Sequence, residues 1–361
     1  MASTNSKPKY LSLQAGRAIA ALLVVLLHAG HFLADPERWN DPRFFRWFGG
    51  GAFGVQAFFV LSGMVIFLAH FNDIDRPQRV SSYLWKRFRR IYPIYWVVLA
   101  LTILTQSFGA RTYAYQHDPL AILSAVLLVK IHPESIVSVS WTLYHEIMFY
   151  LVFAAALLNR WLGIVLLSVW FSLSLFHLSD ATNSLSLVSP MHLLFAMGLV
   201  GAWLLLRGKL PWPSLWLLLG SLLFWGDVIY QGAAASPVWL PLTAGFGALL
   251  TFLGAARLEI LGRLRPPSWL VFLGDASYSL YLIHFMALSK ISGLAWHLNS
   301  RLHWPYSVWF VLFCLLGTFF GCLLHLFIER PLLKWLGRFG AGATAAKANL
   351  VKSHPHPSLT R

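Results

Sequence analysis

The sequence has 361 residues, of which 58% are hydrophobic and only 11% are charged. A soluble domain carries about 25% charged residues, so this composition excludes an ordinary soluble protein as well as disordered, coiled-coil and collagen-like chains. The formal net charge is +15. In so apolar a chain, that excess indicates cationic loops that orient a membrane protein. We therefore expect membrane lipids as partners and no nucleic acid.

Apolar runs follow one another along the whole chain. They cover residues 11–33, 51–70, 91–108, 119–129, 139–158, 161–178, 190–206, 212–231, 239–256, 270–289 and 306–328. Each run is continuous, whereas the strands of a transmembrane β-barrel alternate over about ten residues. The sequence therefore predicts an all-α, polytopic integral membrane protein.

The run at 119–129 is too short to cross a bilayer. As a helix it would be about 16 Å long, roughly half of a hydrocarbon core of about 30 Å. If it does not cross, about ten transmembrane helices remain, and most of the 28 Lys and Arg residues share one side with both termini. The positive-inside rule then predicts that both termini are cytoplasmic and that 119–129 is re-entrant or interfacial.

We expect a membrane-embedded domain over residues 1–338. From 339 to 361 the chain is rich in Gly, Ala, Lys, His and Pro, which is typical of a short disordered tail.

Two polar residues of the first run, Arg17 and His28, are candidates for function because charged and polar groups are costly inside lipid. Their spacing of 11 residues corresponds to about 1100° of helical rotation, close to whole turns, so both lie on one helix face about 16 Å apart. A histidine in such a place is more often a satisfied core residue. The shared face with Arg17 favours a functional pair.

Four cations, Lys86, Arg87, Arg89 and Arg90, directly precede the sequence IYPIYW. They act as an orientation signal, and they are equally suited to bind the phosphates of a nucleotide-bearing cofactor. The residues alone leave both readings open.

Glu146 lies about five residues inside the outer end of its run, at a depth similar to that of His28, so an acid–base partnership is geometrically feasible. The pair His145-Glu146 begins like a zinc-protease motif, but position 149 is Phe, so we predict no metal site.

Near the C-terminal end, Ser277, Tyr281 and His284 recur at helical spacing in LGDASYSLYLIH, where they would either join helices or contact substrate. The sequence Glu329-Arg330-Pro331 is expected to be structural: an ion pair at a helix end, followed by a helix breaker.

Several of these motifs, taken in chain order, resemble the membrane-bound acyltransferase-3 family. The first run carries its Arg-x10-His pair at Arg17 and His28, and KRFRRIYPIYW matches its Arg-x-x-Arg element at Arg87 and Arg90. The segments GAFGVQAFFVLSG, LGDASYSLYLIH and Glu-Arg-Pro match as well, although Gln56 stands where an acidic residue is common. SWTLYHEIMFY resembles the Ser-Trp-x-Leu-x-x-Glu-x-x-Phe-Tyr motif, with Ser140, Trp141 and Glu146. The resemblance covers about residues 10–338.

The resemblance implies a bacterial inner-membrane O-acyltransferase that acylates a surface or exported glycan. Acyl-CoA, with acetyl-CoA expected, would be a co-substrate, and no cofactor would be bound permanently. His28 would act as general base or carry the acyl group briefly, Glu146 would orient it, and Arg87 and Arg90 would meet the phosphates. Arg17 would hold the donor or the first helix, and Ser140, Trp141, Tyr281 and His284 would contact substrate.

Other functions remain open on the residues alone. Buried Arg, His and Glu would also suit a proton-coupled transporter or flippase of a glycan or lipid, although the sequence shows no two-half symmetry. A structural protein of a polysaccharide machine is a further alternative. Among enzymes, the acceptor could be a lipid-linked glycan or a small molecule.

Overall fold

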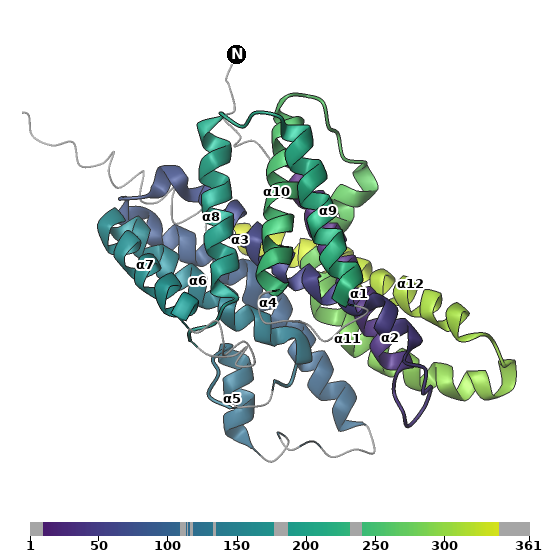
Figure 1. Ribbon diagram of the computed structural model, residues 1–361. Coiled ribbons are helices and arrows are strands. Elements are labelled where there is room, and N and C mark those ends of the chain that lie inside the picture. Colours follow the sequence, from purple (N-terminus) through teal and green to yellow (C-terminus); the bar gives the residue numbers. More distant parts are fainter. Residues whose placement is uncertain are drawn as a thin grey trace, which may run out of the picture.

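The computed structural model describes residues 10–108, 113, 115, 118–132, 135–176, 187–231 and 240–338. The predicted tail over 339–361 lies outside these residues. In the described ranges the chain is helical and has no strand (Figure 1). Its α-helices are α1 (Leu11–Leu33), α2 (Arg43–Phe48), α3 (Phe53–His70), α4 (Val80–Ser107), α5 (Pro119–Leu127), α6 (Trp141–Leu158), α7 (Arg160–Phe176), α8 (His192–Arg207), α9 (Pro213–Gln231), α10 (Leu240–Ile260), α11 (Ser268–Leu302) and α12 (Tyr306–Leu324).

The all-α, polytopic architecture is confirmed. Within the described part of the chain, eight helices are long and apolar enough to cross a membrane. The shorter apolar helices α7 and α8, with 17 and 16 residues, match the two remaining predicted spans. At 1.5 Å per residue they are about 25 Å long, slightly short of a typical core, so their crossing stays a prediction.

The helix ends gather on two opposite sides of the bundle. On one side, the backbone N–H groups of Leu11 and Ser12 donate to Glu259 near the end of α10, each at 2.8 Å. On the other, the Trp39 indole donates to Ser292 at 3.0 Å. We call these the basic side and the opposite side, because the cations Lys86 to Arg90 line a basin on the first together with the start of α1.

The short helix α5 enters from the opposite side and returns to it. Tyr92, Tyr95 and Trp96, about halfway along α4, donate to the backbone carbonyls of residues 125–127 at its end. Tyr113 before α5 and Ser138 after it line the same pocket on the opposite side. The segment therefore does not cross the bundle, as its short length and the distribution of Lys and Arg predicted.

Glycines allow α1 to pack closely between α3 and α11, which is typical of helix contacts in membranes. A Cβ at Gly54 of α3 would lie 2.3 Å from the Ala20 carbonyl oxygen, and one at Gly274 of α11 would lie 2.0 Å from that of Gln14. This close approach holds the polar face of α1 against α11.

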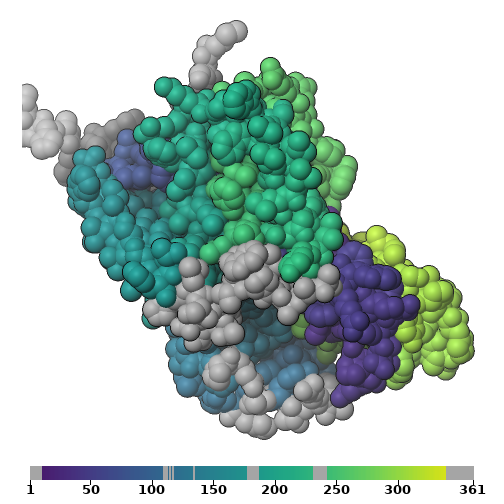
Figure 2. Space-filling view, in the orientation of Figure 1, coloured from purple at the N-terminus to yellow at the C-terminus, as the bar shows by residue number. Residues whose placement is uncertain are grey.

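With 35 residues, α11 is longer than a membrane span, at about 52 Å. Its far end packs with α2 and α12 around the buried Trp39. Figure 2 shows α2 (purple) and α12 (yellow-green) together at this corner of the molecule.

The predicted helix break at Pro331 is wrong. A π-helical turn over His325–Glu329 follows α12, and the chain stays helical to residue 338. Proline removes an N–H and its ring displaces the carbonyl of the preceding turn. A π-turn, with its i→i+5 bonding, supplies a local change of register that lets the helix continue.

Candidate functional site

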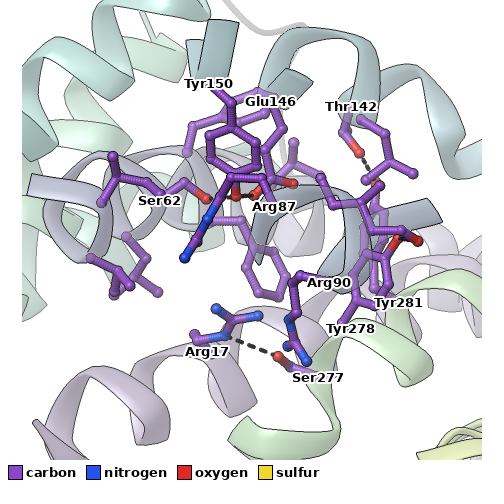
Figure 3. Close-up of a pocket in the computed structure, with 18 residues that line it drawn as sticks. Arg17, Ser62, Arg87, Arg90, Thr142, Glu146, Tyr150, Ser277, Tyr278 and Tyr281 are labelled. Carbon is purple, nitrogen blue, oxygen red and sulfur yellow. Dashed lines mark hydrogen bonds between the residues drawn. The ribbon is translucent and has the colours of Figure 1, made fainter. Parts of the chain in front are cut away.

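A cavity with about 790 Å³ of space opens among α1, α3, α4, α6 and α11. Its polar lining residues, which Figure 3 labels, are Arg17, Ser62, Arg87, Arg90, Thr142, Glu146, Tyr150, Ser277, Tyr278 and Tyr281. Apolar side chains of α3, together with Ile91 of α4 and Leu143 of α6, complete the lining. The structure thus brings together the predicted residues Arg17, Arg87, Arg90, Glu146 and Tyr281.

Three arginines from two helices converge on this cavity (Figure 3). Arg17 Nε donates to the Ser277 hydroxyl at 3.1 Å. The Arg87 guanidinium carbon lies 5.8 Å from the centre of the Tyr83 ring and 5.6 Å from that of Tyr150. Among the described residues, no carboxylate forms an ion pair with Arg17 or Arg87, so the cavity is left with positive charge that an anion can neutralise.

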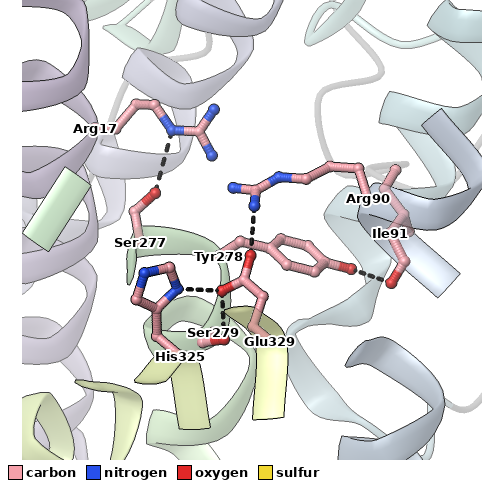
Figure 4. A network of polar contacts seen from close by, with 8 residues as sticks. All are labelled: Arg17, Arg90, Ile91, Ser277, Tyr278, Ser279, His325 and Glu329. Atoms are coloured by element: carbon pink, nitrogen blue, oxygen red, sulfur yellow. Dashed lines mark hydrogen bonds and ion pairs between the residues drawn. The ribbon is translucent and has the colours of Figure 1, made fainter. Parts of the chain in front are cut away.

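The third arginine, Arg90, is held by a buried carboxylate (Figure 4). Glu329 is fully buried and forms an ion pair with Arg90. Its other oxygen accepts from Ser279 Oγ at 2.7 Å and from His325 Nδ1 at 2.6 Å. The Arg90 guanidinium carbon also lies 5.3 Å from the centre of the Tyr278 ring.

This network corrects the structural expectation for Glu329. Its ionic partner is not the neighbouring Arg330 but Arg90, 239 residues away in the sequence. The Arg330 guanidinium instead lies 5.6 Å from the centre of the Phe272 ring.

Glu146 belongs to the cavity and not to the environment of His28. One of its oxygens accepts from the Ser62 hydroxyl at 3.2 Å and from the Tyr150 hydroxyl. The hydrogen-bond partners of His28 are Val24 and His284. The expected contact between Glu146 and His28 is therefore absent from the described residues, since outside α1 the His28 ring contacts His284 and Phe285 of α11.

His28 is paired with a second histidine. His284 is fully buried, and its Nδ1 is 3.1 Å from the Leu280 carbonyl oxygen, which places a proton on that nitrogen and leaves Nε2 as an acceptor. His28 Nδ1 is 3.1 Å from His284 Nε2 and 2.9 Å from the Val24 carbonyl oxygen. These contacts assign the proton of neutral His28 to Nδ1 and leave the lone pair of its Nε2 free to act as a base.

One face of α11 connects the cavity to the histidine pair. Ser277 contacts Arg17 and His284 contacts His28, so both residues of α1 face α11, as their spacing predicted. Between them, Tyr281 lines the cavity, accepts from the Thr142 hydroxyl at 3.0 Å, and has its ring centre 5.9 Å from that of His284. The cavity therefore ends one aromatic ring away from the histidine pair.

Three predicted substrate-contacting residues do not line the cavity: Ser140, Trp141, and also His284, which contacts His28. Ser140 is buried at the start of α6. Trp141 is half-buried, and its ring centre is 6.0 Å from that of His145. Both residues directly precede Thr142, which lines the cavity, so their packing can position the Thr142 side chain.

An open basin on the basic side leads into the cavity. It contains about 1030 Å³ of space and shares Arg17, Val65, Arg87 and Arg90 with the cavity. Its other cations are Lys86, Arg89 and Arg330. The four-cation cluster predicted from the sequence thus forms the entrance of the site.

Sequence reasoning missed several lining residues. Tyr150 lies one helical turn after Glu146, so its spacing could have identified it as a partner. Ser62, Phe58 and Tyr278 lie in apolar segments of α3 and α11 and carry no comparable signal.

Comparisons with known proteins identify the class of this protein. The model of the acyltransferase-3 family, described as "Acyltransferase domain", matches residues 10–326, and the chain belongs to this family. The chain is also similar to the exopolysaccharide production protein ExoZ of Rhizobium meliloti (strain 1021). The two are 30% identical over 303 residues, which cover 79% of this chain and 90% of the relative. No solved structure matches the chain. The protein is thus a multi-pass membrane protein of an acyltransferase family.

The buried carboxylate of Glu329 yields a prediction about stability. Glu329→Ala removes the acceptor of three side chains and should destabilise the protein, at the lower end of about 3–5 kcal/mol because Arg90 is partly exposed. Thermal unfolding of the detergent-solubilised protein measures the effect. Glu37→Ala, at an exposed position, is the control. Equal melting temperatures for the two variants would contradict this role for Glu329.

Proposed function

We propose that this protein transfers an acyl group, acetyl in the first instance, from acyl-CoA to a hydroxyl group of a glycan or lipid-linked glycan. The observation that carries the proposal is the cavity in which Arg17 and Arg87 form no ion pair with any described carboxylate. This cavity is continuous with a basic entrance. The polysaccharide acceptor is supported by the similarity to an exopolysaccharide production protein.

The donor enters from the basic side. Its phosphates bind the guanidinium groups of Arg87 and Arg90, with Lys86 and Arg89 at the mouth of the basin, because guanidinium groups match phosphate oxygens in charge and geometry. The pantetheine arm then extends along the cavity. Glu146 accepts from its amide N–H groups, while Ser62 and Tyr150 hold the carboxylate in place.

The chemistry takes place at His28. The acceptor hydroxyl gives its proton to His28 Nε2, and its oxygen forms a bond to the thioester carbonyl carbon. The carbon–sulfur bond breaks, and the CoA thiolate leaves and takes up the proton. Val24 and His284 fix the imidazole, since both contact Nδ1 and leave Nε2 for catalysis.

The arrangement also supports a particular orientation of the protein and its two substrates in the membrane. Most cations of the site lie on the basic side, which the positive-inside rule makes cytoplasmic, together with both chain ends. His28 lies in the second half of α1, towards the opposite side. In this proposal the protein resides in the bacterial inner membrane, and CoA stays in the cytoplasm while the acceptor hydroxyl approaches from outside.

The test of this mechanism is His28→Ala. Loss of a general base should lower the rate of acyl transfer by about 10²–10⁴-fold while acyl-CoA still binds. Radiolabelled transfer and equilibrium binding of acetyl-CoA measure the two effects. His31→Ala, one turn further along the same helix and exposed, is the matched control. Transfer by His28→Ala at a rate close to that of the wild type would remove His28 from catalysis.

A second prediction concerns donor binding. Each charge-assisted contact to a phosphate contributes roughly 1.5–3 kcal/mol, so the double variant Arg87→Ala with Arg90→Ala should weaken acetyl-CoA binding by about 10²-fold or more. Isothermal titration gives the affinity. The double variant Arg76→Ala with Arg79→Ala removes the same charge at exposed positions outside both cavities. If both double variants bind acetyl-CoA equally well, the cluster is only an orientation signal.

A further inference from the structure

A separate pocket opens on the side opposite the basic entrance. It contains about 440 Å³ of space between the end of α4, the segment 136–138 and the outer half of α11. Ser138 and Lys290 are exposed at its rim, so the pocket reaches the surface. It shares no lining residue with the arginine cavity.

A thin partition separates this pocket from the arginine cavity. On the segment that enters α6, Ser138 lines the outer pocket and Thr142 lines the arginine cavity. On α11, Tyr281 lines the arginine cavity and Phe285, one turn later, lines the outer pocket. The Tyr281 hydroxyl is 3.2 Å from the carbonyl oxygen of Val139, which joins the two halves of the partition.

His28 lies at this partition. The centre of its ring is 5.0 Å from that of His284 and 5.1 Å from that of Phe285, which it meets edge to face. Phe285 lines the outer pocket, and His284 lies next to Tyr281 of the arginine cavity. The base is therefore one side chain away from each of the two cavities.

The lining of the outer pocket suits a ligand with many hydroxyl groups. Gln106 accepts from the Tyr115 hydroxyl, which leaves its amide N–H groups to donate. Within the described ranges, the hydroxyls of Ser138 and Ser289 have no hydrogen-bond partner, and each can both donate and accept. Phe285 supplies an apolar surface against which a ring can pack.

We propose that this pocket binds the sugar ring of the acceptor and presents one of its hydroxyl groups to His28. This assignment rests on the proposed acyl transfer and adds the location and chemical class of the second substrate. The pocket is lined by one cation, Lys290, and by no carboxylate among the described residues, which fits a neutral or acidic pyranose better than a cationic acceptor. Lys290 is already held, since its Nζ donates to the Thr105 carbonyl oxygen at 3.0 Å.

The test is a variant that fills the pocket. Ser289→Phe should raise the KM for a soluble acceptor about tenfold or more, and leave the KM for acetyl-CoA within the error of the wild type. The acceptors are the methyl pyranosides of glucose, galactose and N-acetylglucosamine. Ser107→Phe, at an exposed serine near the end of α4, is the matched control and should change neither KM.

A second variant guards against a folding defect. Gln106→Ala enlarges the pocket and removes its amide donors, so it should raise the same acceptor KM without filling space. If the wild type transfers acetyl groups and both variants have the same acceptor KM as the wild type, the pocket assignment is overturned. The proposed function then remains intact.

Saturation-transfer NMR with the same glycosides, without acetyl-CoA, keeps the two claims apart. Suppose that the wild type binds the glycosides but transfers no acetyl group, and that Ser289→Phe abolishes the binding. This outcome supports the pocket assignment and contradicts the proposed function. A wild type with neither binding nor transfer contradicts both.

Discussion

The arrangement of the cavity and its entrance depends on the free-energy cost of placing arginine charges inside a bundle of apolar helices. A central Arg in a membrane helix costs several kcal/mol unless its charge is paired or hydrated. Glu329 neutralises Arg90, whereas Arg17 and Arg87 face a cavity with no described carboxylate bound to them. The open basin gives these two charges access to water, and it equally admits a ligand of opposite charge. This constraint explains why the entrance is basic.

The helix α11 connects the arginine cavity to the histidine pair. Its polar face meets Arg17 through Ser277 and His28 through His284, and Tyr281 lies between the two contacts. Because α1 and α11 approach closely at Gly274, Arg17 and His28 are both held against α11. In the proposed reaction, acyl-CoA places its phosphates at the basic side while its thioester approaches His28.

The parts predicted from the sequence are those that local geometry determines. Helical periodicity placed Arg17 and His28 on one face, and the short length of 119–129 together with the distribution of Lys and Arg predicted that this run does not cross. The partners of Glu146 and Glu329 depend on how distant helices pack, as 84 residues separate Ser62 from Glu146 and 239 separate Arg90 from Glu329. The break expected at Pro331 failed because a π-turn, which has no sequence signature, precedes it.

The central claim is that donor and acceptor reach His28 from opposite faces of the membrane. Membrane vesicles of defined sidedness, prepared right-side-out and inverted, test it with acetyl-CoA and a methyl pyranoside, each confined to one face. Acetylated glycoside should form only when acetyl-CoA is on the cytoplasmic face and the glycoside is on the external face. Product that forms only when both substrates share the cytoplasmic face would contradict it.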